Sequence, residues 1–123
     1  MITNKFLWTQ GAFGMIAEIS LDVADSDVHK TVFDTAAPEK YQSAVRFSVN
    51  AFVDAYGWKN EKIRTAKITI HSIPIVPSDT TLMALAYVTF RALGEACGID
   101  VESVFFFDDS SGKFSFNQLA GNS

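Results

Sequence analysis

The chain has 123 residues and 48% of them are apolar, which fits one globular domain with a sizeable core. Its formal net charge of −4 gives no electrostatic footprint for nucleic acid, and its single cysteine excludes an internal disulfide. No apolar run approaches the ~20 residues that span a bilayer, and we expect no membrane partner. The opening MITNKFLWTQG lacks the hydrophobic core of a signal peptide, so we expect a cytoplasmic location.

Three strands are predicted in the first third of the chain. A short strand covers residues 5–8, and a turn follows at 10–11. Apolar residues then take every odd position over 13–23, the period-two pattern of a strand with one buried and one wet face. Residues 24–27 predict a turn, and a strand over 29–34 is expected to form a hairpin with its predecessor.

A helix is predicted after the third strand. Pro38 suits the first helical position, where its missing N–H costs nothing, and the acidic Glu39 follows in the first turn. Apolar residues recur at helical spacing until Gly57, which ends the helix. Residues 59–62 form a polar connection to the next strand.

A strand and a second helix occupy the middle of the chain. The strand begins at about residue 63 and shows alternating apolar residues. After the loop 72–78, either Ser78 or Asp79 can cap the helix with a side-chain oxygen, and Gly98 ends it. Apolar residues lie almost all round this helix, which predicts burial on more than one side.

The C-terminal part reads as a phenylalanine-rich hairpin. A strand over 101–107, a turn over 108–113 and a returning strand over 114–116 are predicted, followed by a polar, frayed tail from Asn117. The chain has eleven phenylalanines, which indicates either a well-filled interior or an apolar surface that meets a partner.

The order of these elements predicts an α+β domain over residues 1–123, with one mostly antiparallel sheet and both helices on one face. The second helix would lie between the first helix and the sheet. The opposite, open face of the sheet would carry the polar strand residues, which are Glu18, Ser20, Asp22, Lys67, Thr69 and His71.

No residue pattern predicts catalysis, a bound metal or a cofactor. His29 and His71 lie on separate predicted strands, without the further ligands that a zinc site needs. The sequence SSGK at 110–113 ends like a phosphate loop, but Phe107 stands where that motif has glycine. Cys97 is interpreted as a small hydrophobe on an apolar helix.

Two further stretches have alternative interpretations. Lys59, Lys62, Arg64 and Lys67 come closest to a basic cluster, which we interpret as a solvated strand edge. The loop SIPIVPS at 72–78 places three aliphatic residues around two prolines. It either folds back over the core or presents a rigid apolar tip to a partner.

Two segments and a short upstream motif resemble a known family. The segments are APEKYQSAVRFSVNAFVDA and AKITIHSIPIVPSDTTLMALAYVTFRALGEA, and GAFG at 11–14 resembles the G-Q-[FY]-G that precedes a long strand in the family. The residues that match are Pro38, Tyr41, Ala44, Val45, Ala51, Lys67, Thr69, Asp79, Met83 and Ala84. Together they resemble the fourth domain of the translocase elongation factor G over residues 10–97. The resemblance implies a β/α sandwich of the ribosomal-protein type with a left-handed βαβ crossover, against the general right-hand rule.

The tip loops depart from the family pattern. In the translocase these loops reach the decoding site of the ribosome. Val76 stands where the family carries a histidine, Ala12 replaces a glutamine, and Ser72 and Ile73 replace an aspartate and a glycine. Both tip loops have thus lost polar contacts to RNA. The chain shows no GTPase domain, so no GTP binding is expected.

Three hypotheses follow. The first is a non-enzymatic binding module linked to translation, with the ribosome or RNA as partner, although the acidic charge and the apolar tip weaken the case for both. The second is a protein-interaction or homo-oligomeric module that kept the fold but lost contact with RNA. The third is a small-molecule enzyme with a pocket near His71 and Glu18. The candidate contact residues of the two tip loops are Thr9, Gln10, Gly11, Ala12, Ser72, Ile73, Pro74, Ile75, Val76, Pro77 and Ser78.

Overall fold

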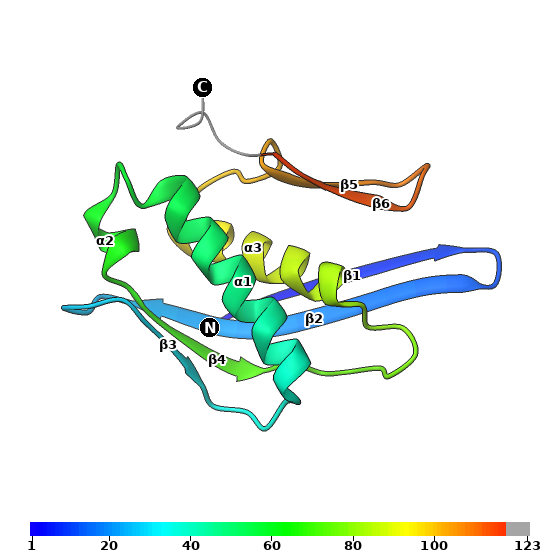
Figure 1. Cartoon of the computed structure of the whole chain (residues 1–123), viewed down its shortest axis with the longest axis horizontal. Coiled ribbons are helices and arrows are strands. Elements are labelled where there is room, and N and C mark those ends of the chain that lie inside the picture. Colours follow the sequence, from blue (N-terminus) through cyan, green and yellow to red (C-terminus); the bar gives the residue numbers. More distant parts are fainter. Residues whose placement is uncertain (118–123) are drawn as a thin grey trace.

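A four-stranded sheet forms the base of the fold (Figure 1). The computed structural model describes residues 1–117. The strand order is β1 (Ile2–Gln10), β2 (Phe13–Ala24), β4 (Lys67–Ser72) and β3 (Lys30–Phe33). The β1–β2 and β2–β4 pairs are antiparallel, whereas β3 runs parallel to β4. The predicted α+β class and mostly antiparallel sheet are therefore confirmed.

The predicted hairpin between the second and third strands is wrong. Lys30 donates its N–H to the Ala66 carbonyl oxygen over 3.2 Å, and Asp34 donates to Ile70 over 2.8 Å, so β4 lies between β2 and β3. Alternating apolar residues determine which face of a strand is buried, but they do not determine which strand it pairs with. The parallel strands β3 and β4 are joined by a helical crossover, as parallel neighbours require. The left hand of that crossover stays a prediction.

The first strand is longer than the sequence pattern indicates. β1 begins at Ile2 rather than at residue 5 and pairs with β2 along its whole length. Asn4 occupies the same side of the strand as the buried Phe6, and this polar residue interrupts the apolar alternation. Pairing with the long β2 therefore extends a strand whose own pattern is visible only in its second half.

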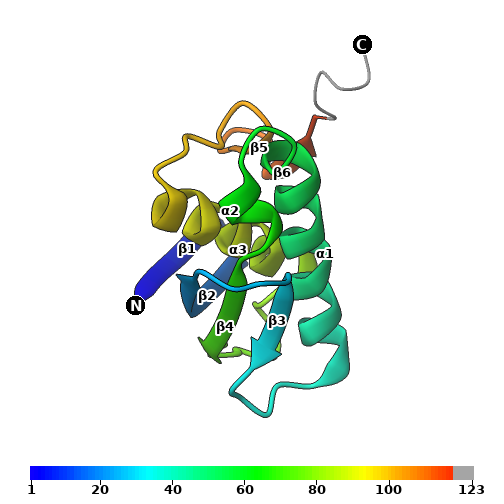
Figure 2. The same ribbon diagram turned by 90° about the vertical axis from the view of Figure 1, so that its left-hand side faces the viewer.

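Helices α1 (Glu39–Tyr56) and α3 (Leu82–Cys97) lie side by side on one face of the sheet (Figures 1 and 2). The buried Ser48 hydroxyl of α1 donates to the Ala86 carbonyl of α3 over 2.7 Å, and the Phe52 and Phe90 rings meet edge-on at 5.5 Å. Beneath them lie the fully buried aliphatic side chains of β2 and β4, which are Ile19, Leu21, Ile68 and Ile70. The prediction of two helices on one face is confirmed, but α3 lies beside α1 rather than between α1 and the sheet (Figure 2).

A third, short helix was not anticipated. Residues Glu61–Arg64 form α2, which the sequence presents only as a polar connection. The Asn60 side chain accepts a hydrogen bond from the Lys62 N–H and begins this helix, and Ile63 is buried. Four residues are too few to show helical periodicity. Because α2 uses these residues, β4 begins at Lys67 rather than near residue 63.

The predicted N-cap of α3 is wrong, whereas its C-terminal end is as predicted. Thr81, rather than Ser78 or Asp79, precedes the helix, and its hydroxyl accepts from the Ala84 N–H over 3.0 Å. A hydrogen-bonded turn over 76–80 occupies the earlier residues and delays the start of the helix. Gly98 adopts φ 70° and ends the helix in the left-handed conformation.

The phenylalanine-rich hairpin forms a separate two-stranded sheet instead of joining the main one. β5 (Phe105–Asp108) pairs with β6 (Lys113–Phe116) and lies across the helices (Figures 1 and 2). The fully buried Phe105 packs against Tyr87 and Phe90 of α3 at 5.3 and 5.5 Å. α3 is therefore covered by the main sheet, by α1 and by this hairpin, which explains its all-round apolar sequence. The frayed tail was predicted to begin at Asn117, but this residue donates hydrogen bonds to the Val104 and Ser103 carbonyls. The rest of that tail lies outside the described residues.

Candidate functional site

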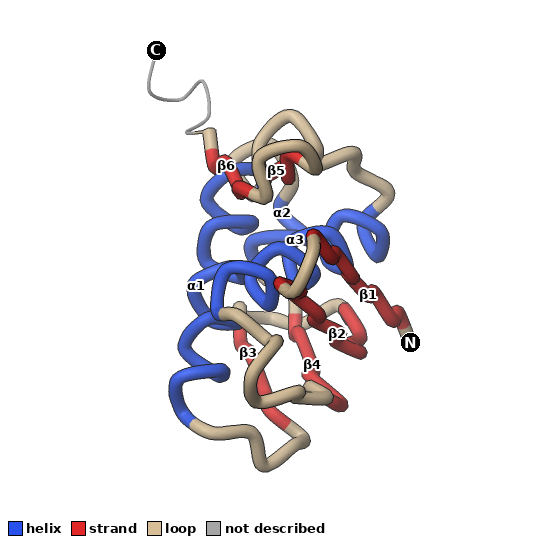
Figure 3. Tube along the Cα trace, turned by 90° about the vertical axis from the view of Figure 1, so that its right-hand side faces the viewer, coloured by secondary structure: helices blue, strands red, loops and turns tan. Residues whose placement is uncertain are grey.

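The two predicted tip loops lie at the same end of the molecule, which faces the viewer in Figure 3. Ile16 of β2 donates its N–H to the Asp79 carbonyl over 3.1 Å. The Thr81 hydroxyl lies 3.8 Å from the Met15 sulfur. These contacts place the loop that connects β4 to α3 next to the first residues of β2. We call residues 9–16 and 72–83 together the loop end.

The β1–β2 connection is a tight turn whose residues are exposed. Gln10 and Phe13 face each other across it, and Gly11 adopts φ 61°, which a side chain would disfavour. Thr9, Gln10, Gly11 and Ala12 are all exposed, as expected for a tip. This turn presents backbone and small side chains to the surroundings.

The second tip loop is divided between the core and the surface. Ile73 is only 6% exposed and Ile75 packs against the core, so this part folds back over the core. Val76 accepts hydrogen bonds at its carbonyl from the Asp79 and Thr80 N–H groups, and its own N–H donates to the Thr80 hydroxyl. The bonds at Val76 order the loop. Its outward-facing residues are Pro74, Val76, Pro77 and Ser78, while Ser72 ends β4 as a half-buried partner of Ser20.

Three apolar residues of this end were not among the predicted contacts. Phe13 is 78% exposed, and Leu82 and Met83 at the start of α3 are 45% and 44% exposed. The odd positions of β2 were expected to be buried, and Ala17 is buried whereas Phe13 is not. Phe13 lies at the first residue of the strand, where nothing covers this side chain among the described residues. The alternation of apolar residues does not show where a strand extends beyond the helices that cover it.

The loop end has no basic side chain. Asp79 is the only charged residue within 9–16 and 72–83. The β5–β6 turn approaches the same strands, because the Trp8 indole N–H donates to the Asp109 carbonyl over 3.1 Å. The exposed Asp108, Asp109 and Lys113 of this turn therefore add a formal charge of −1 near this end. Such a surface suits an apolar protein contact better than a phosphate backbone.

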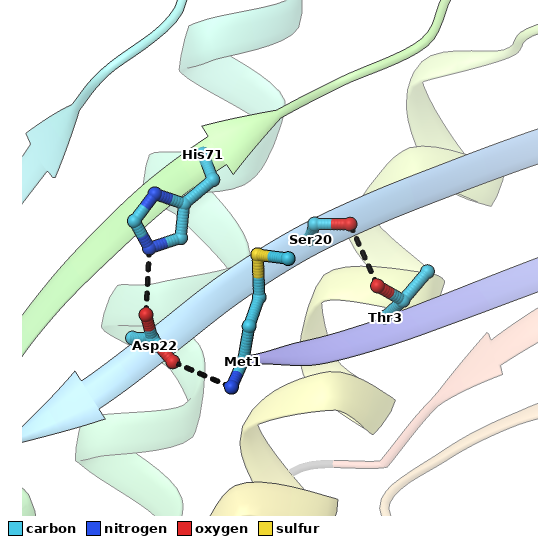
Figure 4. A network of polar contacts seen from close by, with 5 residues as sticks. All are labelled: Met1, Thr3, Ser20, Asp22 and His71. Carbon is cyan, nitrogen blue, oxygen red and sulfur yellow. Dashed lines mark hydrogen bonds and ion pairs between the residues drawn. The ribbon is translucent and has the colours of Figure 1, made fainter.

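Polar residues gather on the open face of the sheet, as predicted (Figure 4). His71 Nε2 lies 2.7 Å from Asp22 Oδ2, and the other Asp22 oxygen is 3.1 Å from the Met1 ammonium. Hydrogen bonds from this ammonium and from His71 hold the pKa of Asp22 below its usual value. The Ser20 hydroxyl pairs with Thr3 over 2.8 Å and not with the histidine.

Among the described residues, this network does not join His71 to Glu18, the two residues near which the third hypothesis places a pocket. His71 pairs with Asp22, and no hydrogen bond in this part of the chain joins it to a nucleophile. No group of three or more His, Cys, Asp or Glu within residues 1–117 could hold a metal ion. Within the same part of the chain, no helix has the length and apolar character required to cross a membrane.

Comparison with known proteins gives a structural match and no family. No family model and no curated protein matches the sequence. A crystal structure of a protein from Thermus thermophilus is similar to this fold, with a TM-score of 0.63 and 14% identity over 76% of the chain. The chain spans 14% of the length of that protein. At this identity the match shows the α+β fold alone, here as a part of a longer chain.

Proposed function

We propose that this chain is a non-enzymatic binding module, built on a domain that resembles the fourth domain of elongation factor G, and that its loop end docks on a protein surface. The observation that supports this most is the exposed apolar set Phe13, Val76, Leu82 and Met83 at an end without basic side chains. Clusters of exposed apolar residues on an ordered scaffold are characteristic of protein-interaction sites.

The resemblance makes the ribosome the first partner to test. Residues 10–97 resemble a domain that works on the ribosome, and the loop end corresponds to the tip of that domain. Since the glutamine and the histidine of that tip are replaced here by Ala12 and Val76, we expect contact with a protein component rather than with ribosomal RNA. Self-association through the same end is the alternative.

Co-sedimentation with purified bacterial ribosomes tests the proposal. An apolar contact should survive a rise from about 50 to 200 mM salt, whereas a contact made through several phosphates should weaken by orders of magnitude. The informative variant is Phe13→Thr with Val76→Thr, which removes two exposed apolar side chains from the loop end. Its matched control is Val28→Thr with Val32→Thr, two exposed apolar side chains just before and within β3.

At about 200 mM salt, where phosphate contacts are weak, we expect the loop-end variant to lose ribosome binding and the control variant to keep it. Analytical ultracentrifugation of the free protein separates the alternative, because self-association that only the loop-end variant abolishes identifies a second copy as the partner. A protein that is monomeric and does not sediment with ribosomes at either salt concentration would overturn the link to translation.

A further inference from the structure

The end of the molecule opposite the loop end gathers half of the basic residues. It faces the viewer in Figure 2, where α2, the preceding loop and the starts of β3 and β4 are seen together. We call it the basic end, and its defining residues are Lys30, Trp58, Lys59, Lys62, Arg64 and Lys67. The sequence places four of these cations close together, but only the fold adds Lys30.

Backbone contacts hold this group in place. Lys30 and Lys67 are register partners at the starts of the parallel strands β3 and β4. Lys30 also donates its N–H to the Ala66 carbonyl over 3.2 Å. At the other side of α2, the Arg64 guanidinium donates to the Gly57 carbonyl over 2.7 Å, next to Trp58. A continuous series of contacts thus runs from the sheet to the loop after α1.

The basic end has a charge opposite to that of the rest of the chain. Residues 25–30 and 58–67 hold five Lys or Arg and three Asp or Glu, a formal charge of +2, while the other five basic and eleven acidic residues give −6. None of these five cations forms an ion pair with a described carboxylate. Like charges directly opposite one another on neighbouring strands, as at Lys30 and Lys67, are destabilising. An external anion would relieve this repulsion.

Trp58 adds an aromatic surface beside the cations. Its side chain is 64% exposed, although large apolar groups are normally buried. The indole N–H donates to the Ala55 carbonyl over 3.0 Å, and the Lys59 ammonium lies 4.6 Å from the ring centroid. The ring is therefore held in a defined position rather than free to rotate. Exposed aromatic rings next to cations are how proteins bind single strands, with bases stacked on rings and phosphates near ammonium groups.

We propose that the basic end binds single-stranded RNA, with a base stacked on Trp58 and the phosphates contacted by Lys30, Lys62 and Lys67. A stretch of acidic protein would use the cations but would gain little from the indole, so Trp58 favours RNA over a protein partner. This site is separate from the loop end. The module would thus hold RNA at one end and a protein at the other.

Fluorescence anisotropy of a labelled oligouridylate, about twelve nucleotides long, tests the proposal at about 50 mM salt. Trp58→Ala should weaken binding about tenfold, and Trp58→Phe should retain most of it. Each phosphate contact with a single strand contributes about 0.7 to the slope of log affinity against log salt. The triple variant Lys30→Gln, Lys62→Gln, Lys67→Gln should therefore reduce the size of that slope by about 2. The matched control, Lys5→Gln with Lys40→Gln and Lys113→Gln, removes the same charge and should leave binding unchanged.

Polyglutamate of similar length distinguishes the other class of partner. We expect polyglutamate to bind more weakly than the oligouridylate, and its affinity to be the same for Trp58→Ala as for the wild-type protein. If polyglutamate binds as tightly as RNA, the basic end recognises acidic proteins and the proposal fails. It also fails if the wild-type protein binds no RNA at this salt, or if both triple variants weaken binding equally. Circular dichroism confirms that each variant is folded before its affinity is compared.

Discussion

Replacing Gly94 with alanine should destabilise the protein, although helix propensity alone predicts the opposite. An alanine in a helix interior is favoured over glycine by about 1 kcal/mol. At Gly94, however, a Cβ atom would lie 2.7 Å from Val101 Cγ1 and 2.8 Å from the Ile99 carbonyl oxygen. Ile99 is itself held by a hydrogen bond from its N–H to the Gly94 carbonyl over 2.8 Å, so this backbone cannot move freely.

The size of the effect follows from these two contacts. Overpacking a close-packed site costs about 1–3 kcal/mol. Because one of the two clashes is with a backbone atom, which cannot rotate away, we take the upper value of about 3 kcal/mol. Subtracting the gain in propensity leaves a net loss of about 2 kcal/mol in the free energy of unfolding. Urea denaturation of Gly94→Ala and of the wild-type protein measures this loss.

A double-mutant cycle with Val101→Ala identifies the cause. Removing the valine methyl groups relieves one of the two clashes, so Gly94→Ala should cost at least about 0.5 kcal/mol less in the Val101→Ala background. A Gly94→Ala protein that is more stable than wild type would refute the reasoning, since it would mean that α3 and the segment before β5 are not packed this closely.

Three further predictions concern α3 and the C-terminal hairpin. Thr81→Ala should lower the free energy of unfolding in urea by about 1 kcal/mol through loss of the α3 cap, whereas Ser78→Ala should change it by less than about 0.5 kcal/mol; equal effects would contradict the observed cap. Hydrogen bonds from the Ser110 and Ser111 hydroxyls lower the pKa of Asp108, so this group adds stability above its unfolded pKa that is lost as the pH falls through its folded pKa. Asp108→Asn should therefore flatten the stability curve below about pH 4, and an unchanged urea-unfolding profile from pH ~2 to ~6 would count against these bonds. Phe105→Ala should cost about 3–5 kcal/mol because the ring is fully buried, and the half-buried Phe106 of the same strand should cost clearly less when changed to alanine; similar melting temperatures for the two variants would mean that the hairpin is not part of the core.

The faces of the main elements could be predicted from the sequence because burial imposes a period on it. The odd positions of β2 include the buried Ala17, Ile19 and Leu21, and the apolar surface of α3 anticipated its burial on several sides. Gly98 also ended α3 as expected, since a left-handed residue is most readily glycine.

Pairing partners and short elements could not be predicted in the same way. Nothing in the period of β3 shows that it pairs with β4 instead of β2, because strand neighbours depend on contacts distant in the sequence. The cap at Thr81 depends on the turn over 76–80, and several residues nearby have equally suitable side chains. For the candidate site, the sequence identified the loops but not the exposure of Phe13, which depends on where the cover over β2 ends.

The most direct test of the central claim is a hydrogen–deuterium exchange footprint of the protein with purified bacterial ribosomes. Our account predicts slower exchange within residues 9–16 and 72–83 when ribosomes are present, and no such protection for the Phe13→Thr, Val76→Thr variant. Protection confined to other segments, or unchanged exchange at the loop end, would contradict the claim that this end is the contact surface.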